Sequence, residues 1–182
     1  MIDYGKEAIQ SPWFPAKFTE NTQIDIESKH FAFADISGFA AGTKLLDFLK
    51  ELVTQYGGIW HNTVVKKLDY MVVCPIYHSF AYKKEVDKYE AAEKLIEQGH
   101  PVAIISDVDL CIKLDCFSKL GVVSKARIAK EYVLNESKFH EKAALKIKTF
   151  IKQNQTSRYK DYLNSELEIA KKIQVGNEIR QY

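Results

Sequence analysis

Apolar runs and amphipathic stretches alternate between residues 31 and 115, and no other feature constrains the fold as strongly. The run Tyr70-Met71-Val72-Val73 is continuously apolar, which is typical of a strand covered on both faces. With helices between the strands, the order predicts an α/β fold, a four-stranded parallel sheet flanked by three helices. We expect the strands over residues 31–36, 59–65, 68–74 and 102–105.

The first expected helix covers residues 43–56, where apolar residues recur at the spacing of one buried helix face. Thr43 is expected as its N-cap, because the hydroxyl can accept a free N–H of the first turn. Gly57-Gly58 is expected to end this helix, since glycine adopts the left-handed conformation easily. Trp60, which follows the glycine pair, is expected in the core. A second helix is expected over 88–98, and a third follows the last strand.

Charge divides the chain into an acidic body and a basic tail. Residues 1–117 carry 12 Lys or Arg and 17 Asp or Glu, whereas residues 118–182 carry 14 and 7. We expect an N-terminal arm over 1–28 whose aromatic residues pack on the body, and a sheet domain over 29–117. A basic helical C-terminal extension is expected over 118–182, and it suits either a polyanionic partner or docking on the body.

Five lysines give the extension its basic face. A helix expected over 135–152 places its apolar residues on one side and the lysines on the other. The face is either a solvated surface or a nucleic-acid contact, and the charge pattern favours neither reading over the other. These lysines are Lys138, Lys142, Lys146, Lys148 and Lys152.

Catalytic, metal and membrane functions find little support in the sequence. No Gly-rich phosphate loop, metalloprotease motif or serine-nucleophile elbow occurs, so we expect neither an enzyme nor a cofactor. His61, Cys74 and His78 lack a fourth ligand at zinc-like spacing, so no metal site is expected. The three cysteines form no CxxC motif and are expected as free thiols in a reducing cytoplasm. The longest uncharged stretch is too short to cross a bilayer, which needs about 20 residues.

Several segments together resemble a BRCT domain over about residues 29–115. They are the strand ending at Ser37-Gly38, the helix end Tyr56-Gly57-Gly58, the run from Val64 to Val73, the helix opening at Lys88, and Ile104-Ile105-Ser106-Asp107. The central run is most similar to BRCT domains of bacterial NAD-dependent DNA ligases and of the replication factor C large subunit. The third helix departs from the family, because Leu110 or Cys111 stands where a tryptophan is usual.

The resemblance implies a phosphate-binding pocket built from Ser37, Gly38 and Lys88. In the family, a hydroxyl and the next N–H at the end of the first strand bind the phosphate together with a lysine of the second helix. Because the second helix is longer here, Lys84 is the alternative lysine. Lys44 is the candidate counterpart of a basic residue that DNA-end-binding members use.

An alternative register of the first strand would place Ala34-Asp35 in the pocket and abolish phosphate binding. Ser37-Gly38 is preferred, because it leaves the loop to Gly57 near the normal length.

These observations together predict a non-catalytic protein of DNA replication or repair. It would bind DNA through phosphate, either a 5′-phosphate end or the backbone. The alternative is a protein–protein interaction module that reads a phosphoprotein or forms a homodimer. We expect a cytoplasmic protein, associated with the nucleoid in a bacterium or located in the nucleus of a eukaryote.

Overall fold

The computed structural model describes residues 8–10, 17–20, 22–36, 40–74 and 80–180. The chain forms two compact units, Met1–Lys113 and Leu114–Tyr182. In the described ranges, no helix combines the length and the apolar character that a bilayer crossing requires.

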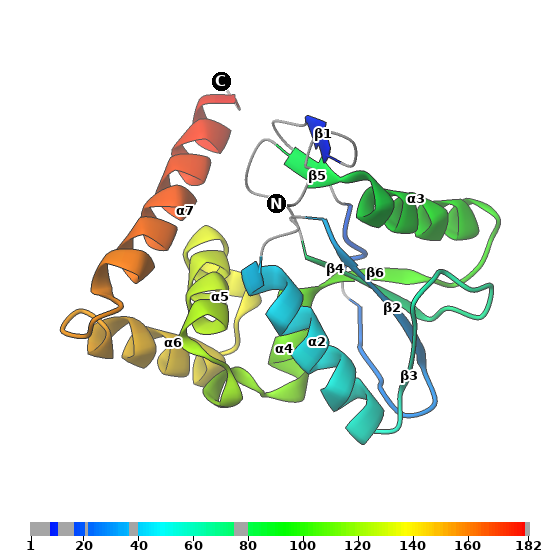
Figure 1. Cartoon of the computed structure of the whole chain (residues 1–182), viewed down its shortest axis with the longest axis horizontal. Helices are drawn as coiled ribbons and strands as arrows, with labels where there is room; N and C mark the ends of the chain where they lie inside the picture. Colours follow the sequence, from blue (N-terminus) through cyan, green and yellow to red (C-terminus); the bar gives the residue numbers. More distant parts are fainter. Residues whose placement is uncertain (1–7, 11–16, 21, 37–39, 75–79, 181–182) are drawn as a thin grey trace. The chain divides into compact units, whose positions relative to one another are not determined.

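The centre of the first unit is a four-stranded sheet whose spatial order is β3-β2-β4-β6 (Figure 1). All three neighbouring pairs are parallel, which confirms the predicted α/β fold. The edge strand β3 is shorter than expected and pairs with β2 only from His30 to Ala32. The strands are β2 (His30–Asp35), β3 (Ile59–His61), β4 (Tyr70–Cys74) and β6 (Ala103–Ser106).

A second, two-stranded sheet was not expected from the sequence. β1 (Ala8–Gln10) pairs antiparallel with β5 (Phe80–Tyr82), so part of the N-terminal arm is joined to the segment before the second helix. Strands of three residues are too short for a polar–apolar alternation to stand out, which is why the sequence pattern indicated only an irregular arm and a loop.

Helix α2 (Ala40–Gln55) follows β2, α3 (Lys83–Glu97) follows β5, and α4 (Asp107–Leu114) follows β6. α2 begins before Thr43, so the predicted N-cap is wrong and Thr43 lies within the helix. α3 begins at Lys83, five residues earlier than expected, because the strong helix formers Lys83, Lys84 and Glu85 extend it. Lys84 and Lys88 therefore lie one turn apart on the same helix.

The two faces of the sheet are covered by different helices. Ala32, Ala34, Met71 and Val73 form one core with buried residues of α3. Phe33 alternates with Ala32 and Ala34, so its ring lies on the opposite face. There the ammonium of Lys50 in α2 lies 5.8 Å from the Phe33 ring centroid. α3 therefore covers one face, and α2 covers the other.

The described part of the N-terminal arm packs on the sheet domain. The Thr19 N–H donates to the Ile104 carbonyl (2.8 Å), and the Ile104 N–H donates to the Thr19 hydroxyl (2.9 Å). The Tyr70 hydroxyl accepts the Asp25 N–H (3.0 Å) and donates to the Gln23 carbonyl (3.2 Å). These bonds satisfy the edge of β6 and fix the chain that leads into β2.

The second unit consists of helices, as expected. α5 (Val122–Leu134) packs against both α6 (Glu141–Gln153) and α7 (Lys160–Arg180), with short 3-10 turns η1 (Phe117–Lys119) and η2 (Glu136–Lys138) between. The single helix expected over 135–152 is wrong, because the backbone is extended at Phe139 and His140. His140 instead caps α6, where its Nδ1 accepts the Ala143 N–H at 3.1 Å.

Two charged side chains of α5, Arg127 and Lys130, are buried, and the neighbouring Glu131 side chain is only 12% exposed. The Lys130 ammonium pairs with Glu166 at 2.8 Å, and the Arg127 guanidinium lies 3.6 Å from Oε1 of Glu131. Within the described residues, that oxygen has no hydrogen-bond partner. Burial raises the pKa of the Glu131 carboxyl to about 7 from an ordinary 4.5, although Lys138 opposes the shift. Folding therefore favours the protonated form of Glu131.

We expect Glu131 to make the protein less stable as the pH rises. The contribution of Glu131 is fully present below its unfolded pKa of 4.5 and is lost as the pH rises to about 7. Urea unfolding at pH 5 and pH 8 measures the change. Glu131→Gln should reduce the pH dependence, whereas Glu136→Gln, at an exposed position, should leave it intact. Equal pH dependence in both variants would contradict the assignment.

Candidate anion-binding site

The candidate site begins where β2 extends beyond its neighbour β3. The Ile59 N–H donates to the Lys29 carbonyl, and the Asp69 N–H donates to the His30 carbonyl. Backbone groups of odd-numbered β2 residues therefore point toward β3, and those of even-numbered residues point toward β4. Among the described residues, pairing with β3 ends at Ala32, so the Phe33 carbonyl and the Asp35 N–H lie beyond that ladder. Such groups need another hydrogen-bond partner.

Two side chains from the beginning of α3 supply the missing partners. Oε2 of Glu85 accepts the Asp35 N–H at 3.1 Å. The Lys88 ammonium lies 3.0 and 3.1 Å from the two Glu85 oxygens and 3.5 Å from the Phe33 carbonyl. We call these four groups the strand-end cluster. Each of the two charged side chains is 21% exposed, so the ion pair is largely shielded from water.

In the strand-end cluster, hydrogen-bond donors that suit an anion bind a carboxylate of the chain itself. A backbone N–H and an ammonium both point at Glu85, and charge-assisted hydrogen bonds of this kind also bind phosphate. The ammonium is partly neutralised by its partner. An external anion can therefore reach Lys88 and the Asp35 N–H only if Glu85 moves away.

Of the three residues of the predicted pocket, the structure describes only Lys88. Lys88 lies at the end of β2, while Ser37 and Gly38 fall outside the described residues. Lys84 is exposed and takes no part in the strand-end cluster. Lys44 is the fifth residue of α2, so its expected place in the first turn is wrong. That correction follows from the earlier start of the helix.

The five lysines of the extension do not form one continuous helix face. Lys138 lies in η2, and the other four lie on α6. Lys142 and Lys146 converge on Asp115, at 3.8 and 2.9 Å. The hydrogen bond from Lys146 is the largest cause that lowers the pKa of Asp115. Lys142 is exposed but lies near Asp115, so the exposed Lys148 and Lys152 are the lysines of α6 best placed to meet a polyanion.

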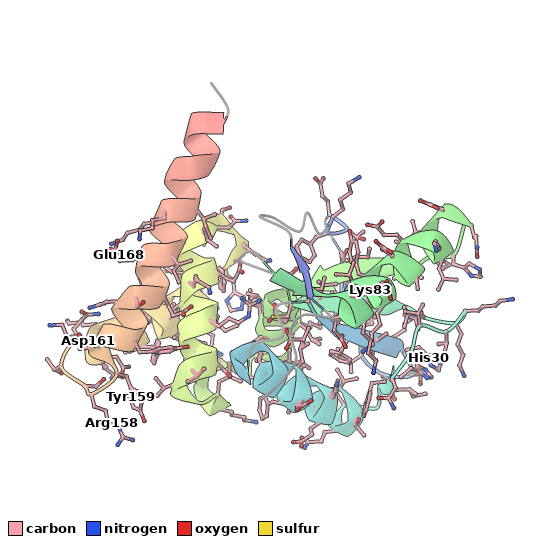
Figure 2. The ribbon with its side chains drawn as sticks, turned by 45° about the horizontal axis from the view of Figure 1, so that its top comes forward. His30, Lys83, Arg158, Tyr159, Asp161 and Glu168 are labelled. Carbon is pink, nitrogen blue, oxygen red and sulfur yellow. The ribbon has the colours of Figure 1, made fainter. Side chains whose placement is uncertain are left out.

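His61 has a structural partner in the sheet. Nδ1 of His30, near the start of β2 (Figure 2), lies 2.8 Å from Nε2 of His61, and the two rings are stacked. Burial, more than the neighbouring His30 and Lys67, lowers the pKa of His61. Cys74 is a buried free thiol, and His78 lies outside the described residues. Among the residues that are described, no group of three His, Cys, Asp or Glu could hold a metal.

Two features of the site region were missed from the sequence. Glu85 stands three residues before Lys88, a spacing that places opposite charges together on a helix, and this signal could have identified the pair. Asp35 entered the sequence analysis only through an alternative strand register, in which it abolishes phosphate binding, and not as a backbone N–H that binds Glu85. Trp60 was expected in the core but is 38% exposed, because β3 is the edge of the sheet.

Neither a known protein family, nor a curated protein, nor a solved structure matches this chain. The sheet order and the helices that cover it define an α/β fold without assigning it to a family.

We predict that removing the Lys88 charge destabilises the protein. Lys88→Met keeps a similar side-chain length but leaves the Glu85 carboxylate without its ammonium partner. We expect a loss of about 1 kcal/mol in the free energy of unfolding, measured by urea denaturation. Lys84→Met, one turn away and exposed, should change it by less than about 0.5 kcal/mol. Equal losses in the two variants would show that the cluster has no structural role.

Proposed function

We propose that this chain is a non-catalytic protein that binds DNA through phosphate, with the strand-end cluster as the phosphate site. One observation carries the proposal: α3 places the Lys88 ammonium beside the Asp35 N–H, where a parallel strand ends. Ligands of open parallel sheets typically bind at the carboxyl ends of the strands. A phosphate group offers more acceptor oxygens and more negative charge than a carboxylate, so it can replace Glu85 there.

The resemblance to BRCT domains supports the same place for the site. In that family the phosphate is bound at the end of the first strand of the sheet by a hydroxyl, an N–H and a lysine. Ser37 and Gly38 follow β2 by two and three residues and would supply the first two groups. The resemblance also supports a role in DNA replication or repair. Within the strand-end cluster the only carboxylate is bonded to the only ammonium, which suits binding better than acid–base chemistry.

DNA is favoured as the partner by the charge of the second unit. Residues 118–182 carry twice as many basic as acidic residues, and Lys148 and Lys152 are exposed on α6. Lysine contacts to the backbone supply most of the affinity of non-specific DNA binding. These lysines would add contacts that do not depend on the DNA sequence.

A phosphopeptide is the second candidate ligand, and the position of the Glu85 carboxylate supports it. A protein carboxylate already occupies the donors of the strand-end cluster. A phosphoserine or phosphothreonine side chain could replace it in the same way. The partner would then be a phosphoprotein, and the basic face of α6 would not be needed for binding.

The test is a set of fluorescence anisotropy titrations with 5′-phosphorylated duplex DNA, unphosphorylated duplex DNA, a phosphopeptide and its unphosphorylated form. We expect the phosphorylated duplex to bind more tightly than the unphosphorylated one. Lys88→Met should abolish this preference, while the matched control Lys84→Met should retain it. Glu85→Gln should strengthen binding several-fold, because the amide no longer neutralises Lys88.

Salt dependence separates the two candidates. DNA affinity should fall steeply between about 50 and 200 mM salt, and the double variant Lys148→Gln, Lys152→Gln should reduce the slope of log K against log salt by about 2. A phosphopeptide that binds tightly with a weak salt dependence would favour the second candidate. If neither phosphorylated ligand binds better than its unphosphorylated form, the proposed function is wrong.

A further inference from the structure

Three large apolar side chains are exposed at the edge of the sheet, with those of Ile59 and Trp60 on opposite faces of β3. Tyr56, Ile59 and Trp60 are 53%, 45% and 38% exposed and follow directly after α2. We call them the β3 edge patch. The turn that holds them is tight: Gly57 has a φ of +82°, and a Cβ at Gly58 would lie 2.6 Å from a Val53 methyl. The patch is thus presented by a well-defined backbone.

The backbone of β3 offers free hydrogen-bonding groups beside this patch. The Ile59 N–H points at β2, where it donates to Lys29. By alternation, the N–H and the C=O of Trp60 point outward, away from the sheet. No described residue pairs with either group. Exposed sheet edges are usually protected by charge or proline, but Ile59, Trp60 and His61 provide neither a proline nor a permanent charge.

The charges beside Trp60 indicate what kind of partner fits. A groove lies between Trp60 and α2, and the Lys50 ammonium lies 5.0 Å from the Trp60 ring centroid. Asp47 and Glu51 line the same groove. Two carboxylates against one ammonium repel a nucleic acid. Lys50 is moreover already paired with Asp47, at 3.5 Å. The fit to a second copy comes instead from the backbone, because a strand whose middle residue directs both its N–H and its C=O outward is its own complement in an antiparallel pair.

We propose that a second copy of this chain docks on β3, with the two β3 strands antiparallel about a twofold axis at Trp60. Trp60 is the middle residue of the strand, and both its backbone groups point outward. The two copies would therefore exchange N–H to C=O bonds at Trp60, the reciprocal pattern of an antiparallel pair. The N–H of Asn62 would donate to the Gly58 carbonyl of the second copy. The two sheets would then form one continuous sheet.

The side chains suit this arrangement on both faces. The two Trp60 side chains would lie directly opposite each other on the α2 face, and cross-strand aromatic pairs are stabilising. On the other face Ile59 would lie opposite His61 of the second copy. An edge of three residues buries little surface, so the dimer is weak and forms in a concentration-dependent way. The contact is independent of the strand-end cluster and of its ligand.

Sedimentation velocity on the full chain, from about 5 to 500 µM, tests the dimer through its concentration dependence. We expect the average mass to rise toward that of a dimer. Trp60→Lys and Ile59→Lys should both remain monomeric, because each places ammonium groups in the interface. Ile96→Lys, at a similarly exposed position on α3, should still dimerise. A monomer at all concentrations, or a dimer that both β3 variants retain, would overturn the proposal.

A disulfide between two copies of the chain independently tests how the two β3 strands would be paired. In an antiparallel hydrogen-bonded pair the Cα atoms lie about 5.5 Å apart, within the range that a disulfide spans. The three natural cysteines are buried. Trp60→Cys should therefore form a covalent dimer on mild oxidation at high protein concentration, much faster than Ile96→Cys. Equal rates would rule out a twofold axis at Trp60.

Discussion

The ion pair between Glu85 and Lys88 is the contact on which the candidate site depends. β2 is longer than its neighbour β3, so the Phe33 carbonyl and the Asp35 N–H lie beyond the described β2–β3 pairing. The first two turns of α3 satisfy both groups with one carboxylate and one ammonium. The same bonds hold the helix against the strand and gather the donors that an external anion would use. In the proposed function, stability and phosphate binding would therefore compete for one set of groups.

Much of the fold could be predicted because strands buried on both faces need apolar residues throughout. Tyr70, Met71, Val72 and Val73 are all buried in β4, as their continuous apolar run indicated. The strands β1 and β5 could not be predicted, since tertiary pairing and not a local pattern creates them. The boundaries of α2 and α3 were less predictable, because helix formers continue beyond the residues that show periodicity.

The candidate site was less predictable than the fold. Lys88 could be named as a candidate because the BRCT domains that the chain resembles carry a phosphate-binding lysine near the start of the second helix. The contact of its partner Glu85 with the strand end depends on the side-chain rotamer of Glu85, and a sequence pattern does not specify rotamers. The burial of Trp60 was predicted wrongly, because an apolar residue of a strand is reliably buried only if the strand lies inside the sheet. β3 is an edge strand, so the same residue type becomes part of an exposed patch.

The amide of Asp35 reports most directly on whether the strand-end cluster binds phosphate. A nitrogen–proton NMR titration of the full chain with inorganic phosphate, and then with 5′-phosphorylated DNA, follows this amide as Glu85 is displaced. We predict a saturable shift of the Asp35 amide that Lys88→Met abolishes and Glu85→Gln brings to lower phosphate concentration. If resonances of α6 shift while Asp35 stays unchanged, phosphate does not bind at the end of β2.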